Sequence, residues 1–235
     1  MMIIVLSMKS QFRHRPSIAL FAFAAIFLHA SAAVKAPPPA GKATDYTAVE
    51  THADEQISIA AEPFDSKEKE AFFHIDYLRY YFLPVRVIIT NNSDKALQLS
   101  EVRIQFFSAN NDKIPAALPE DVERRVDVPR NPSRPGVPLP LPIPLPIKKK
   151  STDKDKQIEA DFNTFGFQAL AVEPHSTQAG FLFYDVQGLD YPPLKDAHLL
   201  LKRLQVADKP GQPAHDLLDF EISFNPYVAA HPKSQ

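Results

Sequence analysis

The sequence predicts an all-β chain folded as an antiparallel β-sandwich, with one or two short helices and a proline-rich insertion. Apolar and polar residues alternate over short stretches in 85–107 and again in 167–224, as they do in strands that bury one face. Clusters of Asn, Asp and Ser between these stretches indicate turns. The chain also has 23 Pro against 6 Gly, which favours stiff, irregular connections and disfavours glycine-rich phosphate loops.

Residues 1–33 have the pattern of a secretory signal peptide. Lys9, Arg13 and Arg15 precede an unbroken apolar run of 11 residues, 18–28, and the small residues Ala30-Ser31-Ala32 form a signal peptidase site. A membrane-spanning helix needs about 20 apolar residues, so cleavage is favoured over retention as an anchor. We therefore expect a periplasmic or secreted protein with no stable membrane span.

The mature chain is mildly acidic and has no cysteine. Removal of residues 1–33 takes away three bases and no acid, so the net charge moves from −2 to −5. A negative net charge does not favour binding to nucleic acid, which is itself negatively charged. An exported domain without disulfides depends on its apolar core, and the hydrophobic content of 45% makes such a core feasible.

Three segments precede the clearest strands. Residues 34–55 contain APPPAG and show no periodicity, so they are predicted to be a flexible leader. A first strand is predicted at 56–60. Residues 65–81 are then predicted to form a helix, because Asp65 and Glu68 resemble a capping box and good helix formers follow.

The clearest pair of strands lies within residues 85–107. The residues expected to share the core face are Val85, Val87 and Ile89 in the first strand and Val102, Ile104 and Phe106 in the second, with a turn at Asn91–Asp94 between them. Ile88 and Phe107 lie on the opposite faces. If those faces are solvated, these two residues contribute less to stability; equal contributions would mean a sheet buried on both faces.

A proline-rich arm, residues 129–150, interrupts the strand pattern. Proline occupies every second position from Pro138 to Pro146, which removes the amide donors that a sheet requires and favours polyproline II. We expect an exposed arm, preceded by a short helix that begins near Pro119 and followed by another over 151–162.

The arm contains the candidate partner-binding residues. They are its exposed apolar side chains and terminal lysines: Leu139, Leu141, Ile143, Leu145, Lys148, Lys149 and Lys150. Apolar side chains on a polyproline II segment suit an aromatic-lined groove on a partner. The alternative is that the arm lies along the protein's own sandwich and fills a gap there.

The last third of the chain returns to strand patterns. Four strands are predicted, at 167–172, 180–186, 197–206 and 217–224. In the last of these, Phe220, Ile222 and Phe224 alternate with Glu221 and Ser223. Seven strand candidates thus form a single β-sandwich domain over residues 56–228, and 229–235 is a C-terminal tail.

Three stretches carry a family resemblance: VRVIITNNSDKALQLSEVRIQFFSANNDKI, EPHSTQAGFLFYDV and LLDFEISF. They resemble the telokin-like, immunoglobulin-type domains of exported bacterial proteins of unknown function. The resemblance covers about residues 56–114 and 165–226 and implies an immunoglobulin-like sandwich. It transfers no catalytic residue, and the helix at 65–81 and the arm depart from the pattern.

The histidines offer two weak constellations. His74 and Asp76 would share a face of a strand but not of a helix, so a surface or helix-end histidine is the favoured interpretation. The set His175-Ser176, His198 and His215-Asp216 permits a Ser-His-Asp triad on paper. However, the GxSxG turn that would expose a nucleophilic serine is absent from the sequence.

The clustered acids suit helix starts better than metal sites. The sets Glu120-Asp121-Glu123 and Asp153-Asp155 do not match the DxDxDG calcium loop, whereas acids in a first turn stabilise a helix N-terminus. We therefore predict no catalytic, cofactor-binding or metal-binding residue.

Together these observations favour a non-enzymatic interaction or structural module of the cell envelope or secreted fraction. It would bind a protein or an envelope polymer through a sheet edge, through loops or through the arm. The alternative is a hydrolase whose site is assembled from dispersed His and Asp or Glu residues.

The N-terminal pattern makes a testable prediction. In a bacterium with a secretory pathway, the chain should be recovered outside the cytoplasm with its N-terminus at Ala33 or Val34, because signal peptidase requires small residues at −3 and −1. N-terminal sequencing of fractionated cells measures this. Met1 or Met8 on soluble cytoplasmic protein would contradict the prediction.

Overall fold

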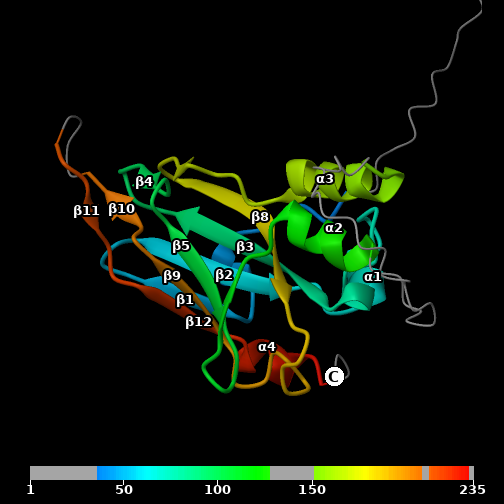
Figure 1. Cartoon of the computed structure of the whole chain (residues 1–235). Coiled ribbons are helices and arrows are strands. Elements are labelled where there is room, and N and C mark those ends of the chain that lie inside the picture. Colours follow the sequence, from blue (N-terminus) through cyan, green and yellow to red (C-terminus); the bar gives the residue numbers. More distant parts are fainter. Residues whose placement is uncertain (1–35, 128–150, 208–211, 233–235) are drawn as a thin grey trace, which may run out of the picture. The chain divides into compact units, whose positions relative to one another are not determined.

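The described part of the chain consists of three antiparallel sheets with helices packed against them (Figure 1). The computed structural model describes residues 36–127, 151–207 and 212–232, and these belong to one compact unit. Twelve strands lie in these ranges, so the prediction of a mostly β chain is confirmed. No helix in the same ranges has both the length and the apolar character needed to cross a membrane.

The central sheet has the order β1-β2-β3-β8. Its strands are β1 (Val49–His52), β2 (Ile57–Pro63), β3 (Phe82–Asn91) and β8 (Ser176–Asp185). All ten residues of β3 are buried. Ile89 of β3 lies opposite Ile59 of β2 on one edge and Gln178 of β8 on the other, so β3 is enclosed by hydrogen-bonded neighbours.

Two further sheets complete the β structure. The facing sheet contains β12 (Phe220–Ser223), β9 (His198–Lys202), β5 (Arg103–Phe107) and β6 (Lys113–Pro115) in that order. The small sheet contains β11 (His215–Asp216), β10 (Gln205–Val206), β4 (Leu97–Gln98) and β7 (Ala171–Val172). All three sheets contribute side chains to one inter-sheet core.

The inter-sheet core contains most of the residues that the alternation placed there. Its buried members include Val85, Val87 and Ile89 from the central sheet and Phe106, Leu199, Leu201, Phe220 and Ile222 from the facing sheet. Val102 and Ile104 are only partly buried against it. The predicted core face of β3 is therefore confirmed.

Both predicted helices that flank the arm are present. They are α2 (Pro119–Asp127) and α3 (Asp153–Phe165). Thr152 caps α3: its side chain accepts the Asp155 N–H at 3.2 Å, and the Asp155 carboxylate accepts the Thr152 N–H at 2.7 Å. This reciprocal pair is a capping box. A last short helix, α4 (Asn225–Ala230), follows β12 and extends past the domain boundary drawn at residue 228.

The second face of the central sheet is buried as well. At one end it packs on a helix-side core of Phe64, Phe72, Phe73, Ile75, Tyr77, Phe82, Val122, Val126, Ile158, Phe165, Phe181 and Phe183. At the other end Ile88 and Ala60 pack on Ala43 of the 3-10 turn η1 (Ala43–Asp45). The sheet is thus covered twice, which a sandwich with a solvated outer face would not be.

The predicted helix at 65–81 is wrong beyond its first turn. Only α1 (Lys67–Glu70) and the 3-10 turn η2 (Leu78–Tyr80) are helical, and the N-cap is Ser66 rather than Asp65. The residues between them include four that are buried in the helix-side core: Phe72, Phe73, Ile75 and Tyr77. An irregular path points all four to one side, which a regular helix could not do at this spacing.

The expected flexible leader is corrected for residues 43–52. These residues contain η1 and β1, and β1 pairs with β2 along its whole length. Four residues are too few to show a period in the sequence, so only the pairing reveals this strand. The predicted signal peptide, 1–33, and the arm, 129–150, lie outside the described residues.

The two buried faces of β3 generate a stability prediction. Ile89→Ala in the inter-sheet core and Ile88→Ala on the opposite face should each lower the free energy of unfolding by about 2–5 kcal/mol, because both side chains are fully buried. Urea denaturation measures both. As a control, Leu170→Ala, at a residue that is 74% exposed, should cost less than about 0.5 kcal/mol. A near-neutral Ile88→Ala would contradict double burial.

Candidate functional site

The candidate partner-binding residues of the proline-rich arm lie outside the part of the chain that the structure describes. They are Leu139, Leu141, Ile143, Leu145, Lys148, Lys149 and Lys150. Their role remains a prediction.

The residues considered for a Ser-His-Asp triad contact other groups in the structure. The Ser176 hydroxyl donates to the Glu173 carbonyl at 2.7 Å. His175 Nε2 lies 2.9 Å from Asp94 Oδ1 on the exposed surface. The His198 ring stacks on Phe107 with centroids 5.0 Å apart. Asp216 Oδ1 accepts from Gln205 Nε2 at 2.7 Å. None of these described contacts joins a serine to a histidine or a histidine to Asp216, so they do not form a Ser-His-Asp relay.

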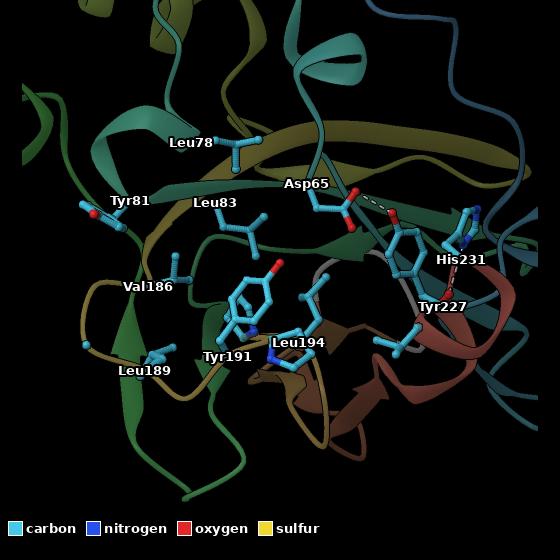
Figure 2. Close-up of a pocket in the computed structure, with 14 residues that line it drawn as sticks. Asp65, Leu78, Tyr81, Leu83, Val186, Leu189, Tyr191, Leu194, Tyr227 and His231 are labelled. Carbon is cyan, nitrogen blue, oxygen red and sulfur yellow. Dashed lines mark hydrogen bonds between the residues drawn. The ribbon is translucent and has the colours of Figure 1, made fainter. Parts of the chain in front are cut away.

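An apolar pocket lies where β3 begins, beside the loop that follows β8 and beside α4 (Figure 2). Its volume is about 370 Å³. The side chains that line it are mostly apolar and come from distant parts of the sequence: Leu78, Tyr81, Leu83, Val186, Leu189, Tyr191, Pro192, Pro193, Leu194, Tyr227 and Val228, with Asp65 and His231 as the charged or titratable members. This volume falls within the range of small-molecule sites.

Local backbone geometry shapes the pocket walls. Tyr81 ends η2 in the left-handed region, with φ 63°, which turns the chain into β3. Gly188, which also lines the pocket, has φ 85°, a conformation that favours glycine. Tyr81 and Tyr191 are 55% and 79% exposed, so both present aromatic surface at the rim.

One end of the pocket is polar. The Tyr227 hydroxyl donates to Asp65 Oδ1 at 2.7 Å and accepts from Lys69 Nζ at 2.6 Å. Lys69 Nζ also lies 3.6 Å from Asp65 Oδ1 and donates to the Pro63 carbonyl at 3.0 Å. The His231 ring stacks on Tyr227 with centroids 4.3 Å apart. The phenol of Tyr227 is therefore held in place from several sides.

A second polar arrangement joins His74 to Asp161. The sequence offers Asp76 as a partner only if the segment is a strand, and it favours a surface or helix-end histidine; the His74 side chain is 44% exposed. His74 Nδ1 lies 2.6 Å from Asp161 Oδ1, and the Tyr77 hydroxyl donates to Asp161 Oδ2 at 3.0 Å. The same carboxylate accepts the His74 backbone N–H. Asp161 is fully buried, and its 87-residue separation from His74 explains why no spacing rule found the pair. Burial and the Asp161 charge raise the pKa of Tyr77.

Glu70 is a buried carboxyl group next to the same loop. Its Oε2 accepts the Leu78 N–H at 3.2 Å, while Oε1 has no hydrogen-bond partner among the described residues. Burial, reinforced by the neighbouring Asp76 carboxylate, raises the pKa of Glu70 to about 8. Glu70 is therefore protonated in the folded protein at neutral pH.

No protein-family model, no curated protein and no solved structure matches this chain.

The raised pKa of Glu70 generates a prediction about pH. The folded carboxyl keeps its proton up to pH about 8, but the unfolded one loses it near its ordinary pKa of 4.5. The contribution of Glu70 to the free energy of unfolding should therefore fall as pH rises between these two values. Above the higher value this contribution should level off.

Glu70→Gln should remove this contribution. Denaturant titrations at pH 5, 6.5 and 8 should show the variant gaining stability relative to the unaltered chain at each step. The exposed Glu173→Gln is the control, with a constant difference. If the difference in free energy of unfolding between Glu70→Gln and the unaltered chain is also independent of pH, the pKa of Glu70 is not raised in the folded protein.

Proposed function

We propose that this chain is an exported, non-enzymatic binding module that holds its partner through the loop-lined pocket beside α4. One observation carries the proposal: a pocket of about 370 Å³, lined mainly by apolar side chains with a few fixed polar groups at one end. Small-molecule and anchor-residue sites have this composition. Export rests on the N-terminal signal pattern, and the partner is an envelope or secreted component rather than a nucleic acid.

The edges of the central sheet favour binding in the pocket over binding by addition of a partner strand to the sheet. The outer edge of β8 is occupied, because the Phe181 carbonyl accepts the Phe167 N–H at 2.9 Å and the Phe183 carbonyl accepts the Ala117 N–H at 2.7 Å. On the other side of the sheet, β1 lies beside β12, and the Glu221 N–H of β12 donates to the Glu50 side-chain carboxylate. A partner strand requires free backbone groups at an edge, so the occupied β8 edge favours loops as the binding mode.

The finer fold assignment belongs to the same proposal. The central and facing sheets share one core, which is the packing expected of an immunoglobulin-like sandwich. The covering of the second face by α2 and α3 would then be an elaboration of that sandwich.

Blocking the pocket tests the proposal. Propylbenzene should bind the purified chain at one site per molecule, and Val228→Trp should abolish this binding because the larger side chain fills the cavity. Isothermal titration calorimetry measures both. The matched control is Leu170→Trp, at an exposed residue outside the pocket, which should bind as the unaltered chain does. Absence of saturable binding to the unaltered chain would reject the pocket as the binding site.

A second candidate function, a hydrolase, is favoured by the His74–Asp161 pair. A buried carboxylate that orients a partly exposed imidazole is the arrangement of a general base. Among the described residues, however, the hydrogen-bond partners of the His74 ring include no serine or threonine hydroxyl. The pair also fixes the loop between α1 and η2 onto α3, which is sufficient reason for it to form.

Ester hydrolysis separates the two functions. With p-nitrophenyl acetate we expect equal rates for the unaltered chain and His74→Ala. His215→Ala, at an exposed histidine outside the pocket beside α4, is the control for loss of a surface histidine. A loss of about 100-fold confined to His74→Ala, the scale of general base catalysis, would favour the hydrolase.

A further inference from the structure

We propose that the pocket beside α4 takes a neutral small molecule with an apolar body and a hydroxyl group, and that the hydroxyl donates to Asp65 Oδ2. This inference rests on the proposed function, since it names the chemistry of the ligand for the same pocket. It follows from the hydrogen bonds and charges at the polar end of the cavity.

The first step is the unused acceptor on Asp65. The side chain is only 9% exposed. Its Oδ1 accepts from Tyr227, whereas Oδ2 is buried with no hydrogen-bond partner among the described residues. Figure 2 shows Asp65 beside Leu83 and Tyr227 at the edge of the lining side chains, with one oxygen bonded to Tyr227. A buried acceptor without a donor is costly, and a donor on a ligand would remove that cost.

The second step is charge. Lys69 Nζ lies 3.6 Å from Asp65 Oδ1, so the negative charge of Asp65 already has a positive neighbour. A cationic ligand would place a second positive charge near Lys69. A carboxylate ligand would bring its lone pairs against those of Oδ2, a repulsive contact. A neutral donor satisfies the hydrogen bond without either penalty.

The third step concerns the apolar body. Leu83 and Leu194 are buried, and Leu78 and Val186 are partly buried at the pocket wall. These side chains offer dispersion contacts but no hydrogen bonds. A volume of about 370 Å³ lies at the lower end of small-molecule sites. A single substituted ring or a short branched chain is the size of body that fits.

Four probes test which polar group the pocket of the unaltered chain prefers. They share a propyl-substituted ring and differ in the polar group: 4-propylphenol, propylbenzene, 4-propylbenzoate and 4-propylbenzylamine. Isothermal titration calorimetry at pH 7 should give the tightest binding for the phenol. Its advantage over propylbenzene should be on the order of 10- to 100-fold, the scale of a hydrogen bond to a charged group. The benzoate should bind more weakly than propylbenzene.

Substitution at the acceptor isolates its role. Asp65→Ala should reduce the preference for the phenol over propylbenzene to less than about threefold, while propylbenzene itself still binds. Asp190→Ala is the matched control, because Asp190 is exposed, lies in the loop after β8 and is not part of this pocket. If Asp65→Ala does not fold, the probe series on the unaltered chain still decides the question.

The outcomes separate this inference from the proposed function. Binding of propylbenzene with no advantage for the phenol would overturn the hydroxyl assignment and leave the pocket as a binding site. Tightest binding of the benzylamine or the benzoate would overturn it in favour of a charged ligand. No binding of any probe would reject both the assignment and the pocket function.

Discussion

The burial of β3 on both faces and along both edges is the constraint on which the rest of this structure depends. Because all ten residues of this strand are buried, its polar side chains cannot hydrogen-bond to water. Each therefore needs a partner inside the protein. Arg86 Nε donates to Glu62 Oε2 at 2.8 Å, and Arg86 Nη1 donates to the Pro38 carbonyl at 2.6 Å. The Thr90 hydroxyl accepts the Ala43 N–H at 2.9 Å. The segment at 38–46 is thereby fastened to the second face of the sheet.

The opposite end of that face is covered by aromatic side chains and by one buried carboxylate. Phe73 lies near the rings of Tyr77, Phe165, Phe181 and Phe183, which explains why the chain leaves a helical path after α1. Asp161 of α3 then anchors this irregular stretch through His74 and Tyr77. The pocket lies just beyond, where the stretch turns back into β3, so the packing of the helix-side core also positions Leu78 and Tyr81 on the pocket wall.

Several elements could be predicted because their signals are local. The alternation of Val85, Val87 and Ile89 depends only on neighbouring residues. The same is true of the acids Asp153 and Asp155, which indicated the start of the helix that became α3. The strand pairing and the candidate site are different. Asp65 contacts Tyr227 across 162 residues, and β1 becomes a strand only through its pairing with β2. No pattern within a short window contains these relations, and the failure at 65–81 arose where tertiary packing overrode helix propensity.

The sequence by itself determined that the chain is mostly β, which face of β3 and β12 points into the inter-sheet core, and that α2 and α3 flank the proline-rich stretch. It did so because side-chain periodicity and helix caps are properties of adjacent residues. Only the tertiary structure decided that the central sheet is covered on its second face, that His74 pairs with Asp161, and that Asp65 keeps an unused acceptor beside an apolar pocket. Those features depend on which distant segments exclude water from one another, and that is settled by packing in three dimensions.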